Sequence, residues 1–495
     1  MSLKKPNLYA LLGLLRSAAP DEIRRAYLKS AKKLHPDKNQ APGETELFLD
    51  VQQAYQILSD PQRRAAYDAS LPEAVAEPEI KSPLDCRIEI SRAKIATGDE
   101  KQIIYALLNI SAGRDYKKKG IAPPLNICLA LDCSTSMQGP NMEMARASAI
   151  QLVHRLGPDD IFSLVRFSDK AEVPIPAARQ ANLHRTEMQI QMLATGGGTE
   201  IFNGLKVALE EVRRYNNPNY VNHVILLTDG RTYGDEQLCY AEAQIAADEG
   251  IGISGMGIGS GWNDVFLDHL ANLTGGSTMY VQQPQDIERL LNEKFVYLSK
   301  AFAQSVDLYL ETGPGVRVEY AFRIHPEAGK VPFQDVTHLG PVLYDESLSV
   351  LFELAVDGYR TDGQLLTLLD GHLEASIASI MAPIPNMPVK ISVSAMENAE
   401  LISPPVAIVQ ALSKLTLYRM QEKARLAVDS GDYEKATIHL QRMATHLLSQ
   451  GEKDLARTVL LEAKHIEQKN SFSDSGDKQI KYGTRSLLMP GERKL

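Results

Sequence analysis

The sequence predicts a multidomain protein with four parts: an all-α domain, a doubly wound α/β domain, a β-sandwich and a C-terminal helical segment. Three observations predict this. A chain of 495 residues is long enough for three or four domains. Apolar residues recur at helical spacing near the N-terminus, whereas strand-like and helix-like runs alternate in the middle of the chain. After residue 302 the pattern changes to the two-residue alternation of strands, and it then returns to helical spacing.

The composition narrows the class of protein. Hydrophobic residues make up 44% and charged residues 23%, which is ordinary for a globular chain. The net charge of −9 argues against general nucleic-acid binding. No apolar stretch approaches the roughly 20 residues that span a bilayer, and no apolar segment follows the first lysines as in a secretory signal. The four cysteines (86, 128, 133 and 239) form no Cys-x-x-Cys pair, which fits a reducing compartment. We therefore expect a cytoplasmic protein.

A small all-α domain is predicted at residues 1–70. Pro20, followed by two acidic residues, is typical of the first turn of a helix, where the exposed N–H groups favour acids. Apolar residues then recur at helical spacing up to Leu34 and give one buried face. A second amphipathic helix contains Phe48 and Tyr55. Four basic residues form a stripe on the other face of the first helix: Arg25, Lys29, Lys32 and Lys33.

The tripeptide His35-Pro36-Asp37 lies between these two helices, and its proline ends the first of them. Together with the patterns at 7–14, 48–60 and 63–68, it resembles the J domain of the DnaJ family. In that family the basic helix and this loop dock on a DnaK-type chaperone and stimulate its ATPase. The resemblance implies that His35, Pro36 and Asp37 trigger the ATPase. It also implies a chaperone-docking patch made of Arg25, Lys29, Lys32 and Lys33.

The basic stripe has two other interpretations. It is also what a solvated helix face or a nucleic-acid patch would look like. The stripe is confined to one short helix, and no aromatic platform for stacking bases accompanies it. The attached His-Pro-Asp loop favours chaperone docking.

Two segments connect the first domain to the next. Residues 71–84 carry three prolines and three glutamates, which is typical of an extended linker. Residues 85–121 contain strand-like runs at 87–90 and 103–107. These strands are expected to pair with later ones, so that the α/β domain would be inserted into a split sandwich.

The doubly wound α/β domain is predicted at residues 122–302. Its alternating pattern indicates an open, mostly parallel sheet that is covered by helices on both faces. Such sheets bind ligands in the crevice at the carboxyl ends of their strands. Strands are predicted at 125–131, 160–167, 221–228, 250–258 and 277–282. Helices are predicted at 141–156, 201–214, 234–248, 263–273 and 285–298.

Oxygen-bearing side chains follow two of these strands. Asp132, Ser134 and Ser136 come directly after the first strand, and Asp229 comes after the third. Thr199 lies between them in a glycine-rich segment. Oxygen ligands without sulfur or imidazole suit a hard cation, so we predict a Mg²⁺ site, with Mn²⁺ and Ca²⁺ as alternatives. A helix-capping turn would explain the first three residues alone. A phosphate cradle is disfavoured because the Gly-x-x-x-x-Gly-Lys-Ser/Thr pattern is missing.

The α/β segment resembles the von Willebrand factor A domain, and the oxygen cluster resembles its metal-ion-dependent adhesion site. The matching segments are 132–136, 197–199 and 228–230. The resemblance implies that the hydroxyls of Ser134, Ser136 and Thr199 bind the metal directly. It implies that Asp132 and Asp229 bind directly or through water, and that one coordination position stays open for a carboxylate of a protein partner.

The remaining chain is predicted to hold a β-sandwich at 303–398, a helical hairpin region at 399–469 and a tail at 470–495. Turn signals separate the β-rich runs of the sandwich. Glycines at 431 and 451 mark breaks between helices. Within the tail, the segment 482–488 is a candidate for docking back onto the body.

These parts together suggest a co-chaperone-like adaptor. The first domain would recruit a DnaK-type chaperone, and the α/β domain would bind an unidentified protein that offers an Asp or Glu. A metal-dependent scaffold subunit of a complex associated with an AAA-type ATPase is the alternative. We do not expect an enzyme, because the sequence offers no arrangement of nucleophile and base. Nucleic acid and membrane spans are not expected.

Overall fold

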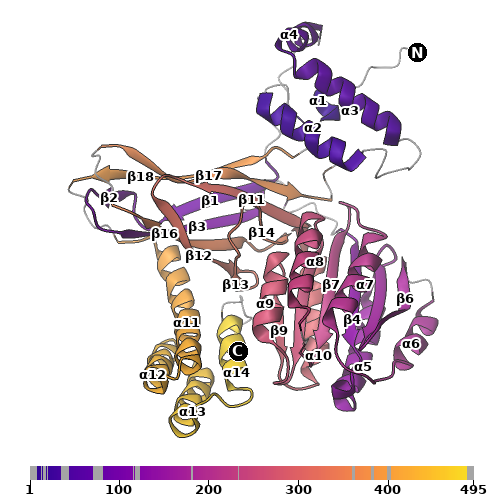
Figure 1. Cartoon of the computed structure of the whole chain (residues 1–495), viewed down its shortest axis with the longest axis vertical. Helices are drawn as coiled ribbons and strands as arrows, with labels where there is room; N and C mark the ends of the chain where they lie inside the picture. The colour runs from indigo at the N-terminus through magenta and orange to yellow at the C-terminus, as the bar shows by residue number, and fades with distance from the viewer. Residues whose placement is uncertain are drawn as a thin grey trace. The chain divides into compact units, whose positions relative to one another are not determined.

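The chain divides into two compact units, and the second begins at Leu84. The computed structural model describes residues 8–12, 14, 18, 20–34, 44–70, 82–114, 116, 123–179, 182–231, 234–358, 363–378, 380, 384–397 and 403–487. Figure 1 shows the first unit in indigo. The second unit contains the α/β domain, the sandwich and the C-terminal helices.

The first unit is all-α, as predicted. Its main helices have apolar faces that meet in a small core, and the rings of Tyr27 and Tyr55 stack 4.1 Å apart. Its two ends are tied together, because the Tyr9 hydroxyl donates to Asp68 at 2.8 Å while it accepts from Arg64 at 2.9 Å. The helices are α1 (Leu8–Leu11), α2 (Pro20–Leu34), α3 (Glu44–Leu58) and α4 (Pro61–Ser70).

The α/β domain contains a six-stranded sheet in the order β6-β5-β4-β7-β8-β9. All neighbours are parallel except β6, which runs antiparallel to β5 at the edge. The strands are β4 (Leu125–Asp132), β5 (Ile161–Phe167), β6 (Ala171–Arg179), β7 (Val221–Thr228), β8 (Gly252–Ile258) and β9 (Thr278–Val281). The helices are α5 (Pro140–Arg155), α6 (Leu183–Gln191), α7 (Ile201–Arg213), α8 (Glu236–Asp248), α9 (Asp264–Leu273) and α10 (Asp286–Ser299).

Both faces of this sheet are covered, which confirms the doubly wound fold. Every residue of β4 and β7 is buried, as expected for central parallel strands. One apolar core joins the sheet to α5, α6 and α10, and the other joins it to α7, α8 and α9. In Figure 1 the helices of the second set lie in front of the sheet.

Strand β6 and helix α6 were not predicted from the sequence. Pro174 and Pro176 lie within β6, and prolines normally argue against a strand. They are tolerated here because β6 is an edge strand, where missing N–H donors leave no partner unpaired.

The β-sandwich consists of two five-stranded sheets, in the orders β1-β3-β16-β12-β13 and β14-β11-β17-β18-β2. Strand β3 precedes the α/β domain in the chain and pairs with β16, which follows it. The α/β domain is therefore inserted into the sandwich. Strand β1 begins at Leu84, so the end of the predicted linker belongs to the sheet. The strands of the sandwich are β1 (Leu84–Ile90), β2 (Lys94–Ala96), β3 (Gln102–Ala112), β11 (Ser305–Thr312), β12 (Val316–His325), β13 (Gly329–Lys330), β14 (Thr337–His338), β16 (Leu348–Val356), β17 (Leu365–Ser376) and β18 (Met387–Met396). Strands β10 (Ala301–Ala303) and β15 (Val342–Leu343) pair with each other as a separate two-stranded sheet.

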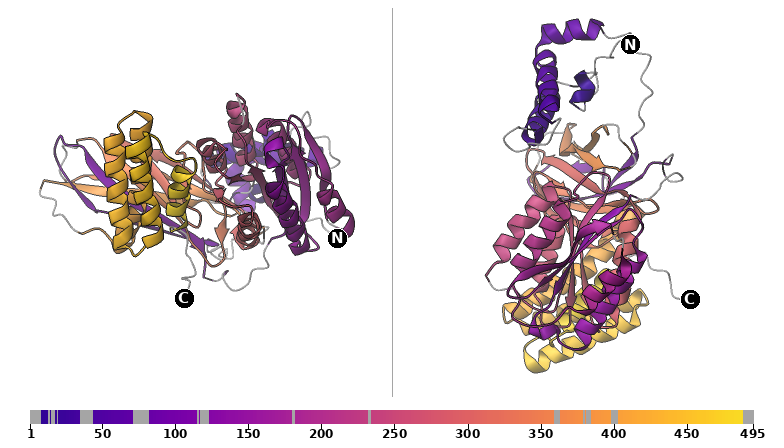
Figure 2. Two further views of the ribbon diagram at one scale, coloured as in Figure 1. Left: turned by 90° about the horizontal axis from the view of Figure 1, so that it is seen from below. Right: turned by 90° about the vertical axis from the view of Figure 1, so that its right-hand side faces the viewer.

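Three antiparallel helices and a fourth, shorter one form the C-terminal part, drawn in orange and yellow in Figure 2. The turns after the first two contain Gly431 and Gly451, which adopt positive φ angles of 78° and 87°. None of the helices in the described ranges is both long and apolar enough to cross a membrane. The helices are α11 (Val406–Asp429), α12 (Tyr433–Ser449), α13 (Lys453–Lys469) and α14 (Gly476–Ser486).

Residues 476–486 of the predicted tail form helix α14, which docks back onto the body, as the sequence suggested for the segment 482–488. This helix is folded and largely buried, and it packs beside α9 of the α/β domain, as Figure 1 shows. Two of its basic residues, Lys481 and Arg485, pair with the buried carboxylate of Asp268.

Candidate metal centre

Two neighbouring parallel strands bring the predicted aspartates to one edge of the sheet. Asp132 is the last residue of β4, and Asp229 directly follows β7. The two strands pair in register up to Leu131 and Leu227, so their carboxyl ends lie side by side. This is the edge at which such sheets bind ligands.

The turn after β4 delivers two hydroxyls toward Asp229. The Ser134 amide donates to Asp132 Oδ1 at 2.8 Å, which fixes the start of the turn. Ser134 Oγ lies 3.0 Å from Ser136 Oγ, and the Ser136 hydroxyl donates to Asp229 Oδ1 at 2.6 Å. The side-chain oxygens therefore form a continuous row from one strand end to the other.

Thr199 also reaches this edge, although it lies 67 residues after Asp132. A Cβ atom placed on Gly230 would be 2.8 Å from Thr199 Oγ1, so the threonine lies against the backbone that follows Asp229. The glycine-rich segment before Thr199 is anchored to the β4 turn, because the Gly197 carbonyl accepts from the Thr135 amide at 3.1 Å and from its hydroxyl at 3.0 Å. The structure thus brings all five predicted site residues together.

The donor set fits a small divalent cation. Oxygens that lie about 2.1 Å from Mg²⁺ in an octahedron stand about 3.0 Å apart, close to the spacing of Ser134, Ser136 and Asp229. Both Asp132 oxygens are already engaged, since Oδ1 accepts from Ser134 and Oδ2 accepts from the Thr228 hydroxyl at 2.6 Å. This favours an orienting role for Asp132. Within the described ranges, no three His, Cys, Asp or Glu side chains gather as a metal cluster, and at this edge hydroxyls stand beside the carboxylates.

The electrostatics of the site also favour a cation. Burial raises the pKa of Asp132, and so does the nearby Asp229 charge, while hydrogen bonds from Thr228 and Ser134 oppose the rise. The pKa of Asp229 is raised as well, mainly by burial. A buried carboxyl and a half-buried one are costly as anions on their own, and a bound cation would offset that cost.

Sequence reasoning missed a residue that shapes the site. Asp169 follows β5 and accepts from the Gly198 amide at 2.7 Å, which positions the segment leading to Thr199. Gly197 has a φ of +82°, and a Cβ atom there would lie 2.4 Å from Asp169 Oδ2, so only glycine fits. Its place in the sequence could have indicated this role, because Asp169, like Asp132 and Asp229, lies at the carboxyl end of a strand of the sheet.

The predicted chaperone-binding residues belong to the first unit. Arg25 is exposed on α2, as expected for a docking residue. Lys29, Lys32 and Lys33 lie on the same helix, but their side chains are outside the described part of the structure. His35, Pro36 and Asp37 lie outside the described residues.

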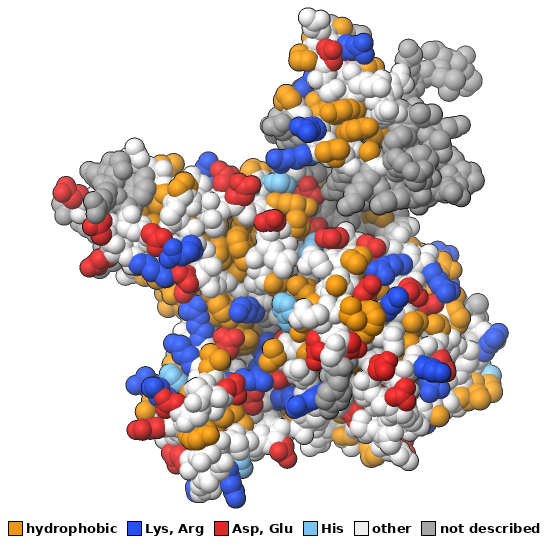
Figure 3. Space-filling view, viewed as in Figure 1, with side chains coloured by type: hydrophobic (Ala, Val, Ile, Leu, Met, Phe, Trp, Pro, Cys, Tyr) orange, Lys and Arg blue, Asp and Glu red, His pale blue; other side chains and the backbone are white. Residues whose placement is uncertain are grey.

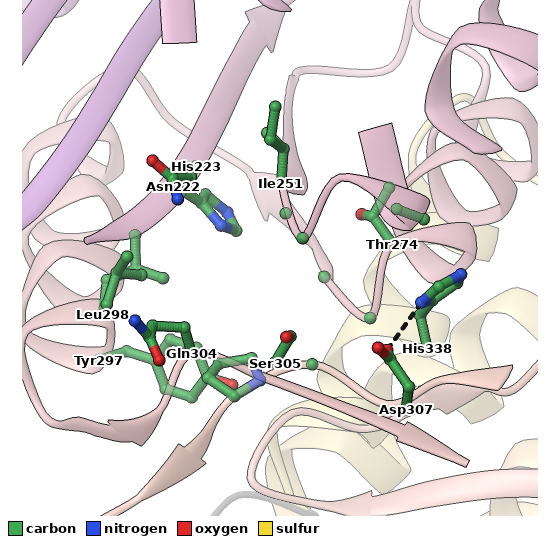
Figure 4. Close-up of a pocket in the computed structure, with 18 of the residues that line it drawn as sticks. Asn222, His223, Ile251, Thr274, Tyr297, Leu298, Gln304, Ser305, Asp307 and His338 are labelled. Atoms are coloured by element: carbon green, nitrogen blue, oxygen red, sulfur yellow. Dashed lines mark hydrogen bonds and ion pairs between the residues drawn. The ribbon is translucent and has the colours of Figure 1, made fainter. Parts of the chain in front are cut away.

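A pocket of about 450 Å³, which is partly open to solvent, lies where the α/β sheet meets the sandwich (Figure 4). It is lined by the first residues of β7 and by β11 and β14, so it is at the opposite end of the sheet from Asp229. Polar groups face it, among them the pair Asp307–His338 at 2.8 Å and the buried His223, whose pKa burial keeps low. It takes no part in the metal centre.

Three family models match separate parts of the chain. Residues 7–68 match the DnaJ domain, and residues 126–293 match the von Willebrand factor type A domain. Residues 406–490 match the Sll0103-like, C-terminal alpha-helical domain, which includes α14.

Some similar proteins match most of the chain, and others match only its DnaJ domain. The uncharacterized protein sll0103 of Synechocystis is 26% identical over 380 residues, which cover 74% of this chain and 89% of that protein. The chaperone protein DnaJ of Lacticaseibacillus casei is 57% identical over 60 residues. The match covers 12% of this chain and only 16% of the length of that chaperone.

Two solved structures share the fold of most of the chain. The von Willebrand factor type A protein from Catenulispora acidiphila is 18% identical, with a TM-score of 0.64 over 82% of this chain and 98% of its own. The ArnB paralog VWA2 from Sulfolobus acidocaldarius is 15% identical, with a TM-score of 0.54 over 83% of this chain and 100% of its own. The chain therefore joins an N-terminal DnaJ domain to a von Willebrand factor type A domain inserted in a β-sandwich.

Proposed function

We propose that this chain is an adaptor between a DnaK-type chaperone and a protein that it binds through a divalent cation. The J domain would recruit the chaperone and stimulate its ATPase, and the von Willebrand factor type A domain would hold the partner. The observation that carries the proposal is the presence, on one chain, of a J domain and of an oxygen-lined site at the ligand-binding edge of the sheet.

The donor set explains how a cation would capture a partner. Three of the five donors, Ser134, Ser136 and Thr199, are neutral, so a bound cation would keep part of its positive charge. An Asp or Glu of the partner would neutralise that charge at a vacant coordination position. In a partly dry crevice this attraction is stronger than at an open surface. The proposed role is therefore binding, and no reaction is assigned to the site.

Two variants test the division of labour. We expect His35→Gln to abolish stimulation of the chaperone's ATP turnover while partner capture from lysate is retained. We expect Ser136→Ala to retain stimulation and to lose partners that wild-type protein captures with Mg²⁺ but not with a chelator. Single-turnover ATPase assays and mass spectrometry of the captured proteins give the two readouts.

The same experiment separates the alternatives. If both variants stimulate ATP turnover and capture the same proteins equally, the adaptor proposal is wrong. If the captured proteins are subunits of an AAA-type ATPase complex and no DnaK-type chaperone responds to the wild type, the scaffold role is the better one.

Arg231 is expected to strengthen the binding of an acidic partner. It is exposed two residues after Asp229, and its Nε donates to the Gly261 carbonyl at 2.9 Å, which anchors the guanidinium beside the site. An exposed ion pair is worth about 0.2–1 kcal/mol, so we expect Arg231→Gln to weaken partner binding by roughly 1.5- to 5-fold. The measurement is the affinity of the captured partner at saturating Mg²⁺ and two salt concentrations. An unchanged affinity and salt dependence would exclude this role.

A further inference from the structure

The C-terminal helix α14 reaches a loop that lies against the metal centre. Lys478 of α14 is only 7% exposed, and its ammonium donates to the Ser260 carbonyl at 2.5 Å. The same ammonium lies 5.1 Å from the centre of the Trp262 ring, within range of a cation–π interaction. Two contacts from one buried lysine thus hold the loop 259–263.

This loop in turn touches the segment that carries Asp229. A Cβ atom placed on Gly261 would lie 2.8 Å from the backbone oxygen of Asp229, so the two backbones are in direct contact. The Gly261 carbonyl also accepts from Arg231 Nε at 2.9 Å. The loop therefore contacts both Asp229 and Arg231.

The other end of this connection is also fixed. The loop leads directly into α9, and the Asn263 side chain caps that helix by accepting from the Phe266 amide at 3.1 Å. Helix α14 is held to α9 by buried ion pairs, in which Arg485 and Lys481 pair with Asp268 at 2.7 Å. The position of Lys478 relative to the loop is therefore set by packing on both sides.

We propose that Lys478 is a positioning residue for the metal centre, which acts through the loop 259–263 on Asp229. The inference rests on the proposed metal-binding function and adds to it a dependence on the C-terminal domain. When α14 is docked, the loop holds the Asp229 backbone where its carboxylate meets Ser136. Because coupling between sites is reciprocal, cation binding should in turn stabilise the docking of α14.

The first test measures the affinity of the full-length chain for Mn²⁺ by isothermal titration calorimetry. Lys478→Met keeps the long stem but removes the donor, and we expect it to weaken Mn²⁺ binding about 3- to 10-fold, the range typical of coupling through a packed network. Lys478→Arg keeps a cationic donor and should restore most of the affinity. Lys464→Met alters an exposed lysine of α13 and should change nothing.

The second test uses the wild-type chain, so it does not depend on the folding of a variant. We expect Mn²⁺ to slow amide hydrogen exchange in α14, but not in α12, because among the described residues the side-chain contacts that hold the loop come from α14. Hydrogen exchange followed by mass spectrometry measures both helices in one experiment.

The outcomes separate the two proposals. If wild-type protein binds no Mn²⁺, the proposed function fails. If it binds Mn²⁺, but Lys478→Met binds equally well and exchange in α14 is unchanged, the metal centre stands and the role of Lys478 is wrong. If Lys478→Met does not fold, the exchange measurement on the wild type decides.

Discussion

Replacing Asp229 with alanine is expected to lower the affinity of the chain for Mn²⁺ by about 100-fold or more. The carboxylate supplies a negative charge at the centre, and Ser136 donates to it at 2.6 Å. Removal of groups that only orient metal ligands already costs about 10- to 100-fold, so loss of a charged ligand should cost at least the upper value. Isothermal titration calorimetry with Mn²⁺ measures the effect.

Asp229 is a better choice for this test than Asp132. Asp132 is fully buried and accepts hydrogen bonds from both the Ser134 amide and the Thr228 hydroxyl, so its removal would disturb folding as well as metal binding. Asp159→Ala, at an exposed residue of the same domain, is the matched control and should leave the affinity unchanged. Equal affinities for wild type and Asp229→Ala would show that the cation binds elsewhere.

Much of the fold could be predicted because the spacing of apolar residues differs between its helices and its strands. The run that ends at Asp132 and the one that ends before Asp229 are mostly apolar and buried at every residue, as is typical of central parallel strands. Their shared direction then places both aspartates at one edge. The five residues of the candidate site were predicted from that geometry and from oxygen chemistry, before any contact between them was known.

The parts that could not be predicted depend on contacts between distant residues. Pro174 in β6 looks like a strand breaker until the strand is known to lie at an edge. Asp169 looks like any loop aspartate until the Gly198 amide is placed beside it. Lys478 looks solvated until Ser260, 218 residues away, lies against it. Periodicity reports which face is apolar, but it cannot report which polar groups become partners.

Ion pairs on the surface and ion pairs in the interior contribute differently to stability. On the face that Figure 3 shows, positive and negative side chains are interspersed over the larger unit. An exposed pair such as Arg317 and Asp357, with both side chains about half exposed, contributes little to stability. The pair of Arg485 and Asp268 has similar geometry but is buried, with both side chains less than 10% exposed. Burial therefore decides which of two similar ion pairs matters.

Replacing Asp268 with alanine is expected to destabilise the docking of α14 by about 3–5 kcal/mol, because it leaves buried cations without their partner. Asp268 accepts two bonds from Arg485 at 2.7 Å and one from the Tyr482 hydroxyl at 3.1 Å. These contacts keep the pKa of Asp268 low, although burial alone would raise it. Once the carboxylate is gone, Arg485 has no carboxylate partner among the described residues, and Lys481 keeps only Asp264.

The measurement is urea denaturation followed by the fluorescence of Trp262, the single tryptophan of the chain. Trp262 is fully buried and its ring lies 5.7 Å from that of Tyr482, so its emission reports whether α14 is docked. Asp357→Ala removes the exposed counterpart and should shift stability by no more than about 1 kcal/mol. Equal shifts for the two variants would mean that the buried network does not hold α14. A selective shift for Asp268→Ala would show that the C-terminal helix is fixed by ion pairs that burial makes strong. The position of Lys478 against the loop 259–263 depends on that docking.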